Sequence, residues 1–363
     1  MSDDFSAESK VLRRGWTTGA CATAATRAAL SALLGDGFPD PVTITLPGGQ
    51  AVDFALAEER QGSGWAEAGI IKDAGDDPDV THGALVLARI APAPPGSGLT
   101  FQAGEGVGMV TRPGLPIAVG EPAINPVPRQ MMRQVVDQLA AAHGVPPDFA
   151  LTLAVRDGAR LAEKTWNPRL GIVGGLSILG TTGIVVPYSC SAWIHSIHRG
   201  VDVARAMGLD HVVGSTGDLS EQAAMRRLGL PMESYIDMGD FVGGLLKYLK
   251  AHPVPRVTIA GGFGKLSKLA QGAMDLHSGR SQVDLDALGQ LVERLGGDTR
   301  LADGVRGALS ANAALALASA AGIAMAPPIA ALARTRAAAM VGDKVQVDIL
   351  VVDRAGVVIG ESS

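Results

Sequence analysis

A short acidic segment is the first candidate for chemistry in this 363-residue chain. It carries four aspartates within one predicted turn: Asp73, Asp76, Asp77 and Asp79. Grouped carboxylates can bind a hard cation, or their mutual repulsion can raise the pKa of one of them and make it a general acid or base. The alternative is a solvated turn with Asp caps, since Gly75 and Pro78 are turn formers. The spacing does not fit a calcium-binding loop, and the sequence leaves these interpretations open.

Glycine-bearing turns are the second candidate. Gly180-Thr181-Thr182-Gly183 follows an apolar run, and such a turn lets backbone N–H groups approach an anion while the threonines donate hydrogen bonds. A tight β-turn is the alternative. Gly264-Lys265 begins a predicted helix after a predicted strand, where the helix N-terminus and the lysine favour an anion such as a carboxylate. Residues 104–108 (Gly-Glu-Gly-Val-Gly) resemble a nucleotide-binding fingerprint, but Pro113 follows too soon for the required helix, so close backbone packing is expected.

Cysteine and histidine chemistry finds weaker support. The two cysteines exclude a disulfide framework and a four-cysteine zinc site. Cys21 lies near a predicted helix N-terminus, which lowers a thiol pKa, but a small buried residue is the alternative. His195 and His198 have a loose metal-ligand spacing downstream of Cys190 without a partner cluster, so no metal site is expected. Ser177 lacks the glycine-flanked elbow of a hydrolase.

Charge and composition exclude whole classes of protein. The chain has 31 basic and 36 acidic side chains, a formal net charge of −5 and 47% hydrophobic residues. Disorder and general nucleic-acid binding are therefore excluded. Residues 308–333 are alanine-rich but interrupted by polar residues and two prolines, which predicts a buried helix rather than a membrane span. The polar, acidic N-terminus fits no targeting peptide, and a cytoplasmic location is expected.

The elements that must position these groups are predicted from periodicity. The N-terminal half combines two helices, at residues 20–34 (N-cap Thr18) and 129–143, with short strands at residues 42–46, 51–56, 65–71 and 83–90. This pattern predicts a two-layer α+β sandwich over residues 1–145. Val145-Pro146-Pro147-Asp148 is the expected domain boundary.

The C-terminal half alternates strands with helices. Strands are predicted at residues 151–155, 171–173, 184–187, 211–214, 234–238, 256–260 and 345–352. Alternation of this kind predicts a mainly parallel sheet, and hence a Rossmann-like three-layer domain over residues 146–363. The fold class expected for the chain is α/β with α+β, with ligands at the carboxyl ends of the parallel strands.

Six motifs in a fixed order go beyond these patterns. They lie at residues 12–22, 72–81, 104–108, 120–129, 167–185 and 264–272. Together they resemble the signature of the cobalt-precorrin-5B C1-methyltransferases of anaerobic cobalamin biosynthesis. Ser267 and residues 275–277 depart from the family pattern, which leaves the role of His277 open.

The resemblance implies an enzyme that transfers a methyl group from S-adenosyl-L-methionine to C1 of cobalt-precorrin-5B, giving cobalt-precorrin-6A. Cobalt enters only as part of the tetrapyrrole substrate. A non-catalytic chaperone that binds corrinoid intermediates is the alternative, and a nicotinamide-dependent reductase is disfavoured. Neither nucleic acid nor membrane is expected as a partner, whereas a homodimer and transient contact with other corrin-pathway enzymes stay open.

Site residues are assigned on the same resemblance. The carboxylates expected to act as a general base, or to hold the sulfonium side, are Asp73, Asp76 and Asp77. The residues expected to bind the substrate's carboxylates are Arg14, Thr17, Thr18, Arg129, Lys265 and Lys268, with solvated surface cations as the alternative for the charged ones. The residues expected to bind the methyl donor are Ser177, Gly180, Thr181, Thr182 and Gly183.

Overall fold

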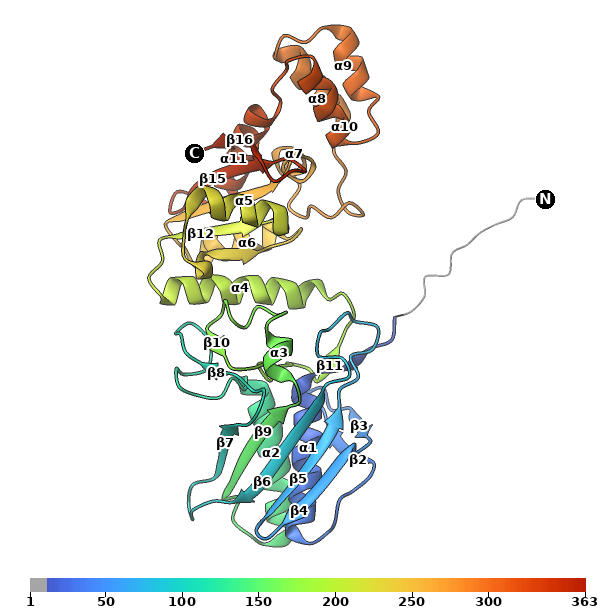
Figure 1. Cartoon of the computed structure of the whole chain (residues 1–363), viewed down its shortest axis with the longest axis vertical. Coiled ribbons are helices and arrows are strands. Elements are labelled where there is room, and N and C mark those ends of the chain that lie inside the picture. Colours follow the sequence, from blue (N-terminus) through green and yellow to red (C-terminus); the bar gives the residue numbers. More distant parts are fainter. Residues whose placement is uncertain (1–11) are drawn as a thin grey trace, which may run out of the picture. The chain divides into compact units, whose positions relative to one another are not determined.

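The computed structural model describes residues 12–363. Its contacts divide the chain into two compact units, with the division between Ser189 and Cys190. Both units combine helices with sheets, so the fold is a mixed α/β fold (Figure 1).

A five-stranded sheet forms the centre of the first unit. Its strands are β4 (Glu58–Gly62), β5 (Trp65–Ile71), β6 (Leu85–Pro92), β7 (Leu99–Ala103) and β9 (Phe149–Val155), in the spatial order β4-β5-β6-β9-β7. All neighbours are antiparallel except β7 and β9. Side chains alternate between buried and partly exposed along β9, as expected for a sheet with one covered face.

Two helices cover that face, α1 (Thr18–Leu34) and α2 (Pro126–His143) (Figure 1). Alanines make most of α1 narrow, so α2, β5 and β6 approach it closely and nearly all of the helix is buried. The N-cap is Thr17, whose side chain accepts the N–H of Ala20 at 3.2 Å. The expected helices are therefore confirmed, but the predicted cap at Thr18 is wrong by one residue.

Shorter elements surround this sheet. They are the hairpin β2 (Val42–Thr45) and β3 (Ala51–Phe54), the pair β1 (Gly15–Trp16) and β11 (Ile184–Val185), the pair β8 (Met109–Val110) and β10 (Ile172–Val173), and helix α3 (Gly158–Ala162). Residues 104–108 form a loop between β7 and β8. A Cβ added at Gly106 would lie 2.1 Å from the carbonyl oxygen of Val155, which confirms close backbone packing there.

The division between the units differs from the expected boundary at 145/146. The turn at residues 145–148 only connects α2 to β9, and β9 is the strand between β6 and β7. The strand-like runs near residues 172 and 184 also belong to the first unit, as β10 and β11. Three strands predicted for the C-terminal sheet thus pair with N-terminal ones, because strand periodicity does not identify the partner strand.

A second five-stranded sheet forms the centre of the other unit. Its strands are β12 (His211–Ser215), β13 (Tyr235–Asp237), β14 (Arg256–Gly262), β15 (Gln346–Val352) and β16 (Val358–Ser362), in the order β13-β12-β14-β15-β16. The first four strands in this order are parallel, and β16 is antiparallel to β15. From β12 the chain moves outward to β13, then crosses back to β14 and onward to β15, so the strand order reverses between β12 and β14.

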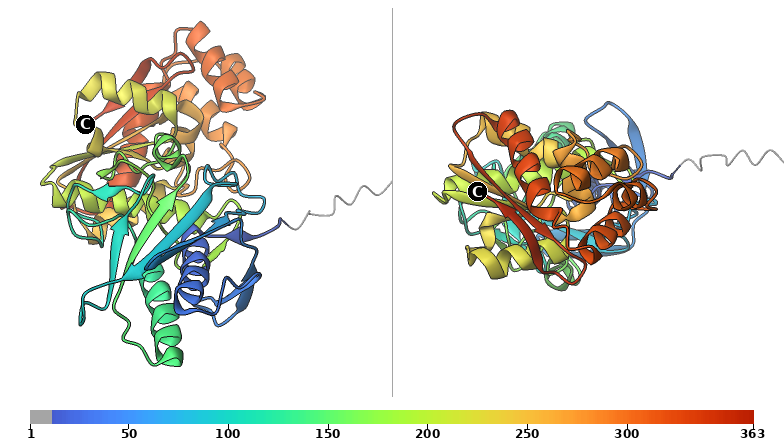
Figure 2. Two further views of the ribbon diagram at one scale, coloured as in Figure 1. Left: turned by 60° about the horizontal axis from the view of Figure 1, so that its bottom comes forward. Right: turned by 90° about the horizontal axis from the view of Figure 1, so that it is seen from above.

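Helices lead into this sheet and connect its strands. They are α4 (Cys190–Ala206), α5 (Asp218–Leu228), α6 (Val242–Ala251), α7 (Phe263–Ala270), α8 (Leu285–Arg294), α9 (Thr299–Arg306), α10 (Ala311–Ala320) and α11 (Ala326–Val341), with the 3-10 turn η1 (Met232–Ser234). Because parallel crossovers are right-handed, α5, which follows β12, and α6, which follows β13, lie on opposite faces of the sheet. Helices α8, α9 and α10 contact one another and form a cluster beside the sheet (Figures 1 and 2).

The alanine-rich segment was expected to form one helix. It instead contributes to two helices, α10 and α11. Gly322 has φ of +78° and follows the end of α10, and Pro327 lies in the first turn of α11, where a residue needs no N–H for the helix. Across residues 12–363, none of the helices combines the length and apolar character that a bilayer crossing requires.

Candidate functional site

Three distant segments meet at the N-terminus of α1. Strand β1 pairs with β11, and the backbone N–H of Trp16 donates to the carbonyl of Asp73 at 2.7 Å. The N–H of Thr17 donates to Gly183 at 2.9 Å, and the N–H of Gly19 donates to Leu179 at 3.0 Å. We call residues 13–19, 73–77 and 179–185 the junction. It brings together the predicted aspartates, Arg14, Thr17, Thr18 and the 180–183 turn.

Each predicted aspartate at the junction has a backbone or ion-pair partner. Asp73 forms an ion pair with Arg13 through both carboxylate oxygens. The hydrogen bond from Arg13, together with one from the N–H of Gly75, lowers the pKa of Asp73 to about 2. Asp76 accepts the backbone N–H of Arg13 at 2.7 Å, and Asp77 accepts that of Tyr188 at 2.8 Å. The pKa of Asp73 is therefore shifted away from, not towards, the range of a general base.

The fourth aspartate is held by a buried lysine that was not among the predicted site residues. The side chain of Lys72 is 1% exposed, and its Nζ lies 2.6 Å from Asp79 Oδ2. Thr81 donates its N–H and its hydroxyl to Asp79 Oδ1 at 2.7 and 2.6 Å. Burial by itself raises the pKa of Asp79, but Lys72 and these hydrogen bonds outweigh it, and the pKa is lowered. The sequence signals for Lys72 were its position beside the acidic segment and its place at the start of the motif at residues 72–81.

The glycines of the junction are required by packing between chain segments. A Cβ added at Gly180 would lie 2.3 Å from Thr17 Oγ1, and one at Gly75 would lie 2.2 Å from the carbonyl oxygen of Arg13. A Cβ at Gly183 would meet Leu46 at 2.5 Å. These glycines let one part of the protein approach another, so the space beside them is filled by protein.

The polar side chains of the same turn bond locally. The hydroxyl of Thr182 lies 3.2 Å from both the N–H and the carbonyl of Ile184, and Thr181 is exposed. Ser177 donates to Asn167 Oδ1 at 3.3 Å. This geometry matches the β-turn alternative for residues 180–183.

The two arginines predicted to bind substrate in the first unit differ in whether they already have partners. Arg129, at the start of α2, donates to the carbonyls of Ile124 at 2.8 Å and Pro122 at 3.0 Å and forms an ion pair with Glu121. Arg14 is exposed, and no ion pair joins it to any residue in the described part of the chain. Arg14 is therefore the junction cation that could bind a substrate carboxylate without first losing a partner.

A cavity of about 810 Å³ lies in the second unit. Its walls follow the carboxyl ends of β12, β14 and β15, with Thr216 and Gly217 after β12, Gly262 at the end of β14 and Asp353 after β15. The N-termini of α5, α7 and α10 also open onto it. This volume lies within the range of about 300–1,000 Å³ that is typical of small-molecule sites.

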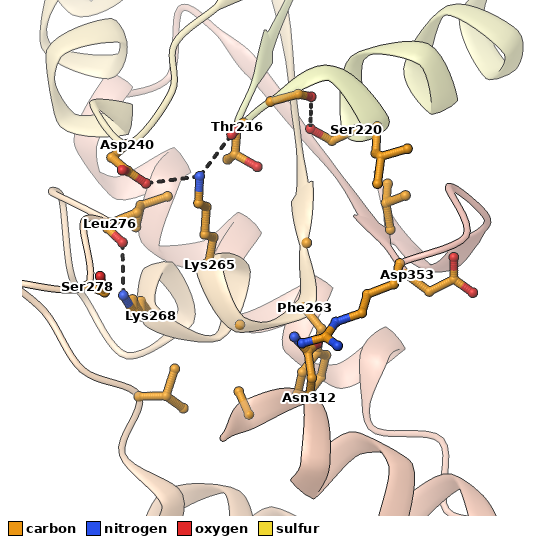
Figure 3. Close-up of a pocket in the computed structure, with 18 of the residues that line it drawn as sticks. Thr216, Ser220, Asp240, Phe263, Lys265, Lys268, Leu276, Ser278, Asn312 and Asp353 are labelled. Carbon is orange, nitrogen blue, oxygen red and sulfur yellow. Dashed lines mark hydrogen bonds and ion pairs between the residues drawn. The ribbon is translucent and has the colours of Figure 1, made fainter. Parts of the chain in front are cut away.

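The two predicted lysines line this cavity, but both are partnered (Figure 3). Lys265 Nζ lies 3.1 Å from Asp240 Oδ1 and donates to the carbonyl of Thr216 at 2.9 Å. Lys268 is 8% exposed and donates to the carbonyl of Leu276 at 2.9 Å. Lys265 and Lys268 therefore lie in the second unit, apart in the chain from the other predicted site residues.

The cysteines and histidines bear on nucleophilic and metal chemistry. Burial raises the pKa of the Cys21 thiol to about 12, so this cysteine is a core residue. Cys190 Sγ contacts Arg280, and His198 stacks on Tyr248. In the part of the chain that the structure describes, no three His, Cys, Asp or Glu side chains are arranged to hold a metal ion.

A cavity at the carboxyl ends of parallel strands is the place where α/β proteins bind small molecules, and the second unit has this arrangement. The chain belongs to the CbiD family. The CbiD family profile matches residues 5–187, and the profile of the CbiD C-terminal domain matches residues 275–363.

Relatives extend this similarity over nearly the full chain. A Rhodospirillum rubrum protein named cobalt-precorrin-5B C(1)-methyltransferase is 62% identical over 99% of both chains. Proteins of the same name are 59% identical in Paramagnetospirillum magneticum, over 98% of this chain and 99% of that one, and 58% identical in Brucella anthropi, over 97% and 96%. A crystal structure of a cobalamin biosynthesis protein (cbiD) from Archaeoglobus fulgidus is 24% identical, with a TM-score of 0.39, over 86% of this chain and 85% of that one.

Proposed function

We propose that the protein methylates C1 of cobalt-precorrin-5B with S-adenosyl-L-methionine as donor, giving cobalt-precorrin-6A in the anaerobic cobalamin pathway. The observation that carries the proposal is the 62% identity to the Rhodospirillum rubrum protein of that name over 99% of both chains. At this identity and coverage, both units and their connecting segments correspond from end to end.

Methyl transfer from a sulfonium does not require a nucleophile from the protein. In the transfer, an electron pair of the tetrapyrrole forms the new bond to the methyl carbon, and the pair of the broken carbon–sulfur bond stays on sulfur. Alignment of the two reactants contributes up to about 7–11 kcal/mol of barrier reduction. A protein that binds and orients both reactants is therefore sufficient, which is consistent with the buried, protonated Cys21.

Within this proposal, the junction binds the tetrapyrrole. Arg14 meets a substrate carboxylate. Thr17 and Thr18 are buried, and the Thr17 side chain caps α1, so both are proposed to support the N-terminus of this helix rather than to contact the substrate. Asp73 is proposed as a positioning residue, since its ion pair with Arg13 holds the segment that carries Arg14.

Asp76 and Asp77 stay candidates for a proton acceptor, because within residues 12–363 each uses only one carboxylate oxygen to accept a backbone N–H. The variants Asp76→Asn and Asp77→Asn test this role. Unchanged turnover in folded protein would remove both from the catalytic machinery.

Further assignments are part of the same proposal. The 180–183 turn and Ser177 are proposed to shape the junction rather than hold the donor, because Thr17 and Leu46 fill the space at its glycines. The second unit is proposed to be Rossmann-like, on its parallel strands and helical crossovers. A cytoplasmic location, a homodimer and contact with other corrin-pathway enzymes stay predictions.

The direct test incubates the purified protein with cobalt-precorrin-5B and methyl-labelled S-adenosyl-L-methionine. We expect mass spectrometry to show one added methyl group and carbon NMR to place the label at C1. Binding of the tetrapyrrole without label transfer, and without calorimetric binding of the donor, would instead support the corrinoid chaperone.

A further inference from the structure

The cavity of the second unit lies where the strand order reverses. Chain connections leave β12 towards β13 on one side and β14 towards β15 on the other. Neighbouring connections therefore diverge at the carboxyl ends of β12 and β14, which opens a crevice. Thr216 and Gly217 follow one of these strands, Gly262 ends the other, and all three line the cavity. Crevices of this origin are where open α/β sheets bind nucleotide-like ligands.

Charge in the cavity argues against a polycarboxylate ligand. Six of its lining residues are charged at neutral pH: Asp218, Asp240, Asp353, Lys265, Lys268 and Arg354. Lys265 already has Asp240 as partner at 3.1 Å, and Lys268 is buried against a carbonyl. Arg354 is exposed and has no ion-pair partner among residues 12–363. One unpaired cation suits a ligand with a single carboxylate better than a tetrapyrrole with many acetate and propionate groups.

The remaining lining groups fit a nucleoside with an amino-acid end. Phe263 and Leu276, both 1% exposed, give the cavity an apolar wall. Asn312, on the first turn of α10, offers a donor and an acceptor, and none of residues 12–363 is hydrogen-bonded to its side chain (Figure 3). No side chain caps the N-terminus of α7 at Gly262, so its N–H groups are open to a carboxylate.

We propose that this cavity binds the methyl donor, S-adenosyl-L-methionine, with its carboxylate at the N-terminus of α7 and its nucleoside between the apolar wall and Asn312. This inference rests on the proposed function. It places the donor in the second unit, whereas the junction that we propose for the tetrapyrrole belongs to the first.

Gly262 permits a test that fills the cavity without disturbing its walls. A Cβ added there meets only the carbonyl oxygen of Val352, at 4.0 Å, and the backbone has φ of −67° and ψ of 152°, which any residue adopts. The side chain of Gly262→Leu would therefore occupy ligand space. Gly48→Leu is the matched control, because a Cβ at Gly48 meets nothing within 4 Å and Gly48 lies in the exposed β2–β3 turn.

The measurement is calorimetric titration of the full chain with S-adenosyl-L-homocysteine, paired with an absorption titration with cobalt-precorrin-5B. We expect Gly262→Leu to weaken S-adenosyl-L-homocysteine binding at least tenfold and to leave tetrapyrrole binding unchanged, while Gly48→Leu changes neither. Asn312→Leu, of similar size, should weaken S-adenosyl-L-homocysteine binding by up to about tenfold through the lost hydrogen bonds. This second variant carries the test if Gly262→Leu does not fold.

The outcomes separate the two proposals. If folded Gly262→Leu and Asn312→Leu both bind S-adenosyl-L-homocysteine as tightly as the wild type does, the cavity assignment is overturned. Labelled methyl transfer by the wild-type protein would in that case still support the proposed function. If Gly262→Leu loses tetrapyrrole binding but keeps S-adenosyl-L-homocysteine binding, the cavity binds the tetrapyrrole, and the donor assignment is overturned as well. A wild-type protein that neither binds S-adenosyl-L-homocysteine nor transfers the label would contradict both proposals.

Discussion

The guanidinium of Arg13 contacts the carboxylate of Asp73 through both terminal nitrogens, with Nη2 at 2.9 Å from Oδ1, across 60 residues of sequence. Two further hydrogen bonds hold the backbone around the pair. The N–H of Arg13 donates to the carboxylate of Asp76, and the N–H of Asp76 donates to the carbonyl of Arg13. The acidic turn therefore fastens the segment that leads into α1.

The pH dependence of stability should reveal this ion pair. The pKa of Asp73 is about 2 in the folded protein, against about 3.9 in an unfolded chain. A lowered folded pKa means that the stabilisation is complete above about pH 4 and is lost as the pH falls towards 2. We expect the melting-temperature advantage of wild type over Asp73→Asn to be present at pH 5 and to shrink below pH 4. A difference that does not change with pH would contradict this assignment.

The buried pair of Lys72 and Asp79 should matter more for stability than any exposed pair. Asp79→Asn leaves a buried ammonium without its counter-charge, and we expect a loss of about 3 kcal/mol in the free energy of unfolding. Lys72→Met removes the buried charge itself and should cost less. Urea denaturation measures both, with Asp157→Asn as control, since the pair of Asp157 and Arg160 is largely exposed. Equal losses for Asp79→Asn and Asp157→Asn would show that burial does not decide the effect.

Replacement of Gly75 should reduce stability through contact with the backbone of Arg13, and not through its positive φ alone. Gly75 and Gly64 have similar φ values of +68° and +76°. A Cβ at Gly75 would meet the carbonyl oxygen of Arg13 at 2.2 Å, whereas a Cβ at Gly64 meets nothing within 4 Å. Both alanine variants carry the left-handed strain of about 1–2 kcal/mol, and Gly75→Ala should lose a further 1–3 kcal/mol by overpacking. Chemical denaturation should separate them, and equal stabilities would refute the contact argument.

Arg14 should contribute to tetrapyrrole binding and little to stability. It is exposed and has no ion-pair partner among residues 12–363. Arg14→Gln should weaken cobalt-precorrin-5B binding about tenfold, as expected for a lost charge-assisted hydrogen bond, with an unchanged melting temperature. The effect should diminish at high salt. Arg300→Gln, an exposed arginine on α9, is the control, and identical affinities of the two variants would remove Arg14 from the site.

Local pattern was sufficient for many elements and for the family. The alanine-rich α1, the amphipathic α2 and the parallel strands β12, β14 and β15 lie close to their predicted positions, because helix and strand periodicity depends on residues only a few positions apart. The six ordered motifs were likewise enough to indicate the family to which the chain belongs. The cavity at the carboxyl ends of the parallel strands also lies where the alternation of strands and helices predicts a ligand site.

Tertiary structure decided which strand joined which sheet and what each polar side chain was free to do. Phe149–Val155 reads as a strand in either unit, and only its pairing with β6 and β7 assigns it to the first. Asp77 accepts the N–H of Tyr188 across 111 residues, and Lys265 forms an ion pair with Asp240 of the preceding strand connection. Such contacts depend on how loops return the chain through space, so the sequence determined the kinds of groups present, and the fold determined which of them were already neutralised by a partner.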